Sequence, residues 1–118
     1  MTAALTQLPP MDVAARAERL RGRVEAAGID ALLVTRLPNV TYLTGFTGSA
    51  AMVLVGPDAL VFVTDGRYAE QAAEQLATAG VEARIEARVS QAAQRDVMSE
   101  AARGYRRLGL EAHGVTWA

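Results

Sequence analysis

Apolar residues recur along this chain in two spacings, and the first marks a helix near the N-terminus. Over residues 13–27 they return every three or four positions, the spacing of one helical face; these are Val13, Ala17, Leu20, Val24 and Ala27. Asp12 stands where it can cap this helix, and Gly28 can end it. Residues 29–35 then form a short, nearly continuous apolar run. Such a run is typical of a strand covered on both faces.

Two further apolar runs lie close together in the middle of the chain. Residues 51–55 and residues 60–63 are separated by Gly-Pro-Asp-Ala at residues 56–59, which has the length and composition of a hairpin turn. We therefore expect the two runs to be antiparallel neighbours in one sheet.

The second half of the chain alternates between helical and strand patterns. Residues 66–79 place their apolar side chains on one helical face, and Gly80 closes that pattern. Residues 81–89 alternate as in an edge strand, with Val81, Ala83, Ile85 and Ala87 facing in and Glu82, Arg84, Glu86 and Arg88 facing out, where charges would guard the edge. A helix over residues 91–105 and a strand over residues 108–111 complete the pattern. The predicted fold class is α/β.

Composition narrows the possible partners. With 118 residues, 51% of them hydrophobic and 21% charged, the chain can bury one core but not two. Its 12 basic residues are balanced by 13 acidic ones, so the positive surface that nucleic acid or an anionic membrane needs is not expected. The sequence has no cysteine, which excludes disulfides and thiol catalysis. No window approaches the ~20 apolar residues of a membrane span, so we expect a soluble chain.

Few residues could carry catalysis. A two-metal hydrolytic site needs several carboxylates and usually a histidine, yet His113 is the one histidine and lies in no recognised ligand spacing. The segment around Ser49 lacks the second glycine of a nucleophile elbow, which disfavours a serine hydrolase. Residues 45–49 lack the Gly-Lys-Ser/Thr ending of a phosphate loop and precede a strand. We therefore predict neither a catalytic residue nor a metal ligand in this chain.

Asp65 and Arg67 lie where a predicted strand passes into a helix. Asp65 can cap that helix, whereas Arg67 lies in the first turn, where the helix dipole disfavours a cation. Arg67 either pairs with Glu70 or a nearby loop carboxylate, or offers its planar guanidinium to a substrate carboxylate or carbonyl above the strand ends. Phe46 lies in the glycine-containing loop before residue 51. There it is either part of a tight connection or a lid or pocket wall.

Two segments together resemble the N-terminal domain of the creatinase/prolidase/aminopeptidase P family of Xaa-Pro peptidases. They are residues 39–50 (NVTYLTGFTGSA) and residues 63–72 (VTDGRYAEQA), in the family's order and spacing, and residues 28–34 (GIDALLV) fit as well. The resemblance extends from about residue 14 to the end of the chain. It implies a mixed β-sheet with helices on both faces, ribonuclease H-like, in a single domain over residues 1–118.

The resemblance also implies that the chemistry lies outside this chain. In the family a larger C-terminal domain of pita-bread fold carries two divalent metal ions, such as manganese, cobalt or zinc, and cleaves the peptide bond before proline. That domain is absent from these residues, and Thr116, a good N-cap residue, is followed by no helix. We therefore expect a truncated chain that is inactive alone. In relatives the N-terminal domain limits substrate size and forms dimers, a role that by position falls to Phe46, Asp65, Arg67 and Tyr68.

Three functions stay open at this point. The first is the substrate-gating and dimerisation domain of a cytoplasmic, proline-specific metallopeptidase, either an aminopeptidase or a dipeptidase, that acts on proline-containing peptides. The second is a non-catalytic peptide- or protein-binding or oligomerisation module on the same scaffold. The third, a small nucleotide-binding α/β protein, rests on fold analogy alone.

Overall fold

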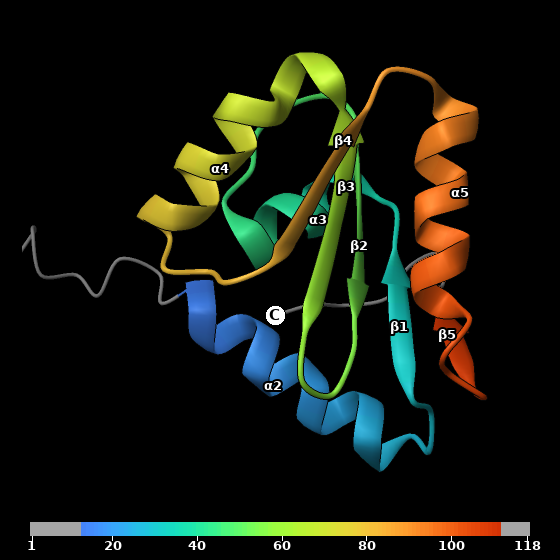
Figure 1. The fold of residues 1–118 in the computed structure, drawn as a ribbon. Helices are drawn as coiled ribbons and strands as arrows, with labels where there is room; N and C mark the ends of the chain where they lie inside the picture. The colour runs from blue at the N-terminus through green and yellow to red at the C-terminus, as the bar shows by residue number, and fades with distance from the viewer. Residues whose placement is uncertain (1–12, 112–118) are drawn as a thin grey trace, which may run out of the picture.

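Five strands form one mixed sheet in the order β4-β3-β2-β1-β5 (Figure 1). The structure is a computed structural model that describes residues 13–111. The strands are β1 (Ala31–Val34), β2 (Ala51–Val55), β3 (Leu60–Asp65), β4 (Arg84–Arg88) and β5 (Leu108–Leu110). β2 pairs antiparallel with both β1 and β3, whereas β4 pairs parallel with β3 and β5 pairs parallel with β1. The predicted hairpin and the mixed sheet are both confirmed.

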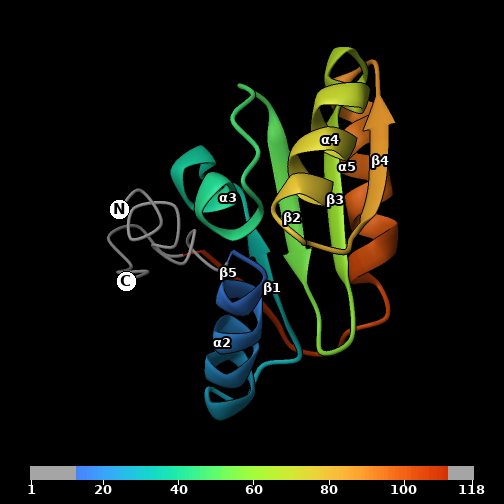
Figure 2. The same cartoon turned by 90° about the vertical axis from the view of Figure 1, so that its left-hand side faces the viewer.

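Helices cover both faces of this sheet. They are α2 (Val13–Ala26), α3 (Leu37–Thr44), the 3₁₀ turn η1 (Gly66–Tyr68) that runs into α4 (Ala69–Thr78), and α5 (Gln91–Ala102). Figures 1 and 2 show α2, α3 and α4 on one face and α5 on the other. This arrangement confirms the expected α/β architecture with helices on both faces. No helix of the described part is long and apolar enough to cross a membrane.

The two faces of the sheet bury separate apolar cores, because neighbouring residues of a strand point in opposite directions. On β3, Phe62 belongs to the larger core beneath α2, α3 and α4, and Val63 belongs to the smaller core beneath α5. Met98 of α5, Leu54 of β2 and Ala31 of β1 complete the buried part of that smaller core. The strands predicted to be covered on both faces are therefore covered by α2, α3 and α4 on one face and by α5 on the other.

Helix α3 was not predicted from the pattern. It begins after Arg36, which makes no side-chain cap, and it has a proline in its first turn and ends at Gly45 with φ of 81°. Its N-terminal amides are capped instead by Glu111, from the other end of the described chain, whose carboxylate accepts from the amides of Thr35 at 3.1 Å and Arg36 at 2.7 Å. The capping partner is distant in sequence, so the local pattern gave a weak signal.

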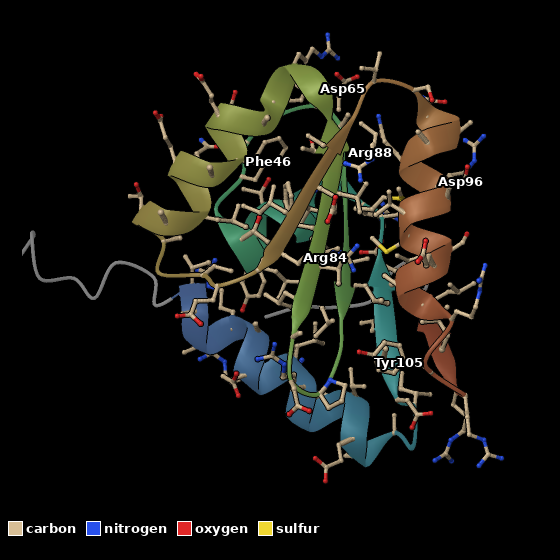
Figure 3. The ribbon with its side chains drawn as sticks, viewed as in Figure 1. Phe46, Asp65, Arg84, Arg88, Asp96 and Tyr105 are labelled. Atoms are coloured by element: carbon tan, nitrogen blue, oxygen red, sulfur yellow. The ribbon has the colours of Figure 1, made fainter. Side chains whose placement is uncertain are left out.

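The charged strand β4 differs from its prediction in two respects. It lies at the sheet edge as expected, but it is limited to Arg84–Arg88, with residues 81–83 outside the regular strand. Its arginines and Glu86 lie on the face that α5 partly covers, so the predicted outward face is only partly exposed to solvent (Figure 3). The helix predicted over residues 91–105 ends at Ala102, and β1 is shorter than the predicted run. Three predictions, on Asp12, His113 and Thr116, lie outside the described residues.

Candidate functional site

Residues 45–50, the loop between α3 and β2, lie against η1 and α4. The amide of Thr47 donates to Gln75 Oε1 at 3.0 Å, and Gln75 Nε2 donates back to Thr47 Oγ1 at 3.0 Å. Ser49 Oγ lies 2.7 Å from the phenol oxygen of Tyr68. The contact between Ser49 and Tyr68 brings together the two segments that carry the resemblance, residues 39–50 and 63–72, which are separated by residues 51–62 in sequence.

The side chain of Phe46 anchors this loop in the larger core. Its ring is fully buried and makes edge contacts with Phe62, at a centroid distance of 5.1 Å, and with Tyr68, at 5.5 Å. The loop needs a glycine at position 48, because a Cβ there would lie 2.2 Å from Cζ of Phe46. The suggestion that Phe46 is an exposed lid does not fit this placement. The Phe46 ring instead points into the core (Figure 3), where it contacts Tyr68.

Asp65 caps the helical segment that follows β3, as predicted. Its Oδ1 accepts from the amide of Arg67 at 3.0 Å. The Arg67 side chain also lies near this carboxylate, with Nε 3.8 Å from Oδ1, so of the two partners considered, Glu70 or a nearby carboxylate, the structure has a nearby carboxylate, that of Asp65. Since the Arg67 side chain is 66% exposed, this pair contributes little to stability but sets the direction of the guanidinium.

Tyr68 joins the loop to the arginine. The guanidinium carbon of Arg67 lies 5.0 Å from the centroid of the Tyr68 ring, within the range of a cation–π contact. Hydrogen bonds from Ser49 lower the pKa of the Tyr68 phenol, since they stabilise its anionic form, and the positive charge of Arg67 acts in the same direction. The result is an exposed guanidinium beside a half-buried phenol, with Asp65 next to the first and Ser49 bonded to the second.

This pair can bind an anion or a carbonyl, but the described residues offer nothing for metal chemistry. Within residues 13–111 no group of three or more His, Cys, Asp or Glu could hold a metal ion. A cavity of about 280 Å³ lies at the other end of the β2–β3 hairpin, near Pro57 and Arg107.

The structure brings together the four predicted site residues, Phe46, Asp65, Arg67 and Tyr68. It adds Ser49, which could not be predicted from the sequence because only the folded loop shows its bond to Tyr68.

The relatives found by comparison with known proteins include peptidases and an N-terminal domain of a peptidase. Over 59 residues, half of this chain, it is 48% identical to the uncharacterized peptidase YqhT of Bacillus subtilis (strain 168). It is 39% identical to the N-terminal domain of cytoplasmic peptidase PepQ from Mycobacterium tuberculosis H37Rv, with a TM-score of 0.70 over 87% of this chain and 77% of that one. The Xaa-Pro dipeptidase from Bacillus anthracis is 32% identical, with a TM-score of 0.75 over 88% of this chain and 28% of its own.

These matches cover most of an isolated N-terminal domain but only a part of the whole enzymes. The chain spans 17% of the length of YqhT and 28% of the Bacillus anthracis dipeptidase, but most of the isolated PepQ domain. Residues 16–118 match the family described as the creatinase/prolidase N-terminal domain. With nearly the whole chain matched and the same mixed sheet in its structural relatives, this chain belongs to the creatinase/prolidase N-terminal domain family.

Proposed function

We propose that this chain is the substrate-gating and dimerisation domain of a cytoplasmic, proline-specific metallopeptidase that hydrolyses the peptide bond before proline. Its similarity to an Xaa-Pro dipeptidase and to a cytoplasmic peptidase supports this function. In this proposal the two divalent metal ions, such as manganese, cobalt or zinc, belong to a C-terminal catalytic domain absent from these 118 residues. The chain alone then has no peptidase activity.

The exposed guanidinium of Arg67 beside the half-buried ring of Tyr68 is the observation that carries the gating role. The Arg67 guanidinium lies near Asp65 and over the Tyr68 ring, and its exposed side chain leaves it open to a ligand. A guanidinium can take both oxygens of a peptide carboxylate in a planar, bidentate contact. The Phe46 ring makes an edge contact with the Tyr68 ring, and Ser49 hydrogen-bonds with the Tyr68 phenol, so both hold Tyr68 in place. This constellation fits a group that orients the free end of a short proline-containing peptide.

Kinetics of the longer enzyme test this role. In the enzyme that joins this chain to its catalytic domain, Arg67→Ala is expected to raise KM for short Xaa-Pro peptides about tenfold, the effect of losing one charge-assisted contact. kcat should change little, since the lost contact serves binding rather than the reacting bond. Arg19→Ala, at an exposed arginine of α2, is the matched control. Kinetics of Arg67→Ala that equal those of the control would remove Arg67 from the site.

The nucleotide sequence beyond the codon for Ala118 tests the proposal more directly. A reading frame that continues into a region with spaced Asp, His and Glu ligands would support a metallopeptidase. A stop codon at that point would refute the catalytic parent.

A second candidate is a peptide- or protein-binding module without catalysis, favoured by the same exposed Arg67. Calorimetric titration of the 118-residue chain with proline-containing peptides distinguishes the two. Saturable heat that Arg67→Ala abolishes would support the binding module. The absence of heat with all peptides would count against it.

A further inference from the structure

Among residues 13–111, strand β4 is paired on one side only. It forms a parallel ladder with β3 and is the outermost strand in the sheet order. Figure 2 shows it at the margin of the sheet, with α4 in front, α5 behind and no described segment beside its outer edge. The backbone groups along such an edge can pair with another strand. The side chains of β4 therefore decide which strand can approach.

The charges along this edge alternate in sign. Glu82, Arg84, Glu86 and Arg88 are the even-numbered residues, and they share one face of the extended segment. Glu86 lies between its neighbours, with 2.8 Å to a nitrogen of Arg84 and 2.8 Å to one of Arg88. The arginines keep about half of their side chains exposed, at 57% and 43%. The edge thus presents both signs of charge in a fixed order.

From this order we propose that the outer edge of β4 pairs antiparallel with β4 of a second copy, about a two-fold axis at Ile85. Around that axis Arg84 lies opposite Glu86 of the second copy, and Glu82 lies opposite Arg88 of the second copy. Every charge of one strand then meets its opposite across the axis, an arrangement that stabilises cross-strand pairs. The two sheets become one continuous sheet through both copies.

The same charges exclude the neighbouring registers. An axis at Glu86 places Glu86 opposite itself and Arg84 opposite Arg88, and an axis at Arg84 places Arg84 opposite itself. Like charges directly opposite each other destabilise a strand pair. Axes at Ala83 and Ala87 also keep opposite charges together, but each pairs only one kind of charged position, whereas the axis at Ile85 pairs Arg84 with Glu86 and also Glu82 with Arg88. The register centred on Ile85 therefore makes the most favourable charge pairs, and the charges disfavour strands of unrelated sequence. Because the contact is two-fold, it uses both edges and closes at a dimer.

The inference deepens the dimerisation role of the proposed function and rests on it, since it names the surface through which two copies associate. The 118-residue chain is measured by sedimentation equilibrium, as wild type and as two charge reversals, Arg84→Glu and Glu86→Arg. We expect the wild type to dimerise reversibly, more weakly at high salt. Each reversal sets like charges opposite each other twice per dimer, and should raise the dissociation constant at least about tenfold.

The decisive experiment uses a mixture of the two variants. Arg84→Glu leaves two glutamates at positions 84 and 86, and Glu86→Arg leaves two arginines there. Neither variant matches itself, but each matches the other in the proposed antiparallel register. An equimolar mixture should therefore regain the dimer, as a heterodimer that mass spectrometry identifies. The controls are Arg19→Glu and Glu25→Arg on α2, which carry the same charge changes away from the edge.

Three results would overturn the inference: a wild type that stays monomeric at millimolar concentration, single reversals that dimerise like the controls, or a mixture that stays monomeric. Thermal melting of each variant verifies that the domain is folded before its association is compared. A dimer that survives both reversals would place the contact on another surface and refute edge pairing alone. The gating role of Arg67 is measured separately by enzyme kinetics, so the two failures are distinguishable.

Discussion

Glu111 accepts a hydrogen bond from the backbone amide of Arg36 over 2.7 Å, although the two residues lie 75 positions apart. Its carboxylate also accepts from the amide of Thr35 and from the side-chain amide of Asn39. Helix α3 lacks a side-chain cap of its own, so Glu111 supplies the acceptor that its first amides need. A negative charge at this end also suits the helix dipole. The end of β5 thereby fixes α3, and α3 leads into the candidate site.

We expect Glu111→Ala to lower the free energy of unfolding by about 1–3 kcal/mol, because it leaves several amides without their acceptor. For a domain of this size that corresponds to a fall in melting temperature of about 4–8 °C per kcal/mol. The matched control is Glu100→Ala, at an exposed position of α5. Thermal unfolding followed by circular dichroism compares the two variants. Equal melting temperatures would show that the cap contributes nothing to stability.

The helix capped by Glu111 also shows where local sequence patterns were insufficient. The other helices and the hairpin could be predicted because their signals are local: a three-to-four spacing for α4, and the turn at Pro57 between two apolar runs. Helix α3 has two local signals that could have revealed it, Pro38 in its first turn and Gly45 at its end. Its main capping group is far away in sequence, so its position depends on the completed sheet.

In the candidate site, too, some features were predictable from local sequence and others were not. The cap by Asp65 was predictable, because the acceptor and the amide of Arg67 are two residues apart. The burial of Phe46 was not, since it depends on the rings of Phe62 of β3, in the same core, and of Tyr68. The sequence left the partner of Arg67 open between Glu70 and a nearby carboxylate, and the 3₁₀ geometry of η1 leaves Arg67 beside its own capping residue, Asp65.

Gly48→Ala tests the packing beneath the loop. The added methyl group would lie 2.2 Å from Cζ and 2.7 Å from Cε2 of Phe46, whose ring is held by Phe62 and Tyr68. The loop or the ring must therefore shift, which we expect to cost about 1–3 kcal/mol of stability. Gly22→Ala is the opposite case, since nothing lies within 4 Å of its new methyl group in α2.

For Gly22→Ala we expect a gain of about 0.5–1 kcal/mol, because alanine favours a helix over glycine. Chemical denaturation of both variants gives the two free energies. A Gly48→Ala protein as stable as the wild type would mean that the loop adapts freely around Phe46.

Ser49→Ala tests the hydrogen bond to Tyr68. Bonds from Ser49 lower the pKa of this phenol below its usual 10.0, so their loss should move the pKa upward. Ultraviolet titration of the folded protein, with Tyr68→Phe to assign the signal, measures the shift. Ser99→Ala on α5 serves as the control. A titration curve that Ser49→Ala leaves unchanged would contradict the bond.

The sign of the linked stability change follows from the direction of this shift. Because the pKa of Tyr68 is lower in the folded state, its contribution to stability is complete above 10.0 and is lost as the pH falls through the folded-state value. The wild type should therefore gain stability over the Ser49→Ala variant as the pH rises through that window. Denaturation at a series of alkaline pH values measures the difference.

Glu86 gives the corresponding prediction on the acid side. Hydrogen bonds from Arg84, and then from Arg88, hold its pKa below the usual 4.5. The lowered value means that its contribution to stability is present above 4.5 and is lost as the pH falls through the folded-state pKa. Carboxyl NMR titration at a protein concentration low enough to keep the chain monomeric measures that pKa directly.

Arg84→Ala and Arg88→Ala should each raise the pKa of Glu86, and Arg84→Ala should raise it more, because its hydrogen bond is the larger cause of the shift. Arg19→Ala on α2 should leave it unchanged. If neither β4 variant moved the titration, the arginines would lie away from Glu86 in solution. The alternating row of charges would then lack the fixed geometry that pairing with a second copy requires, so this titration also tests the starting point of the edge-pairing inference.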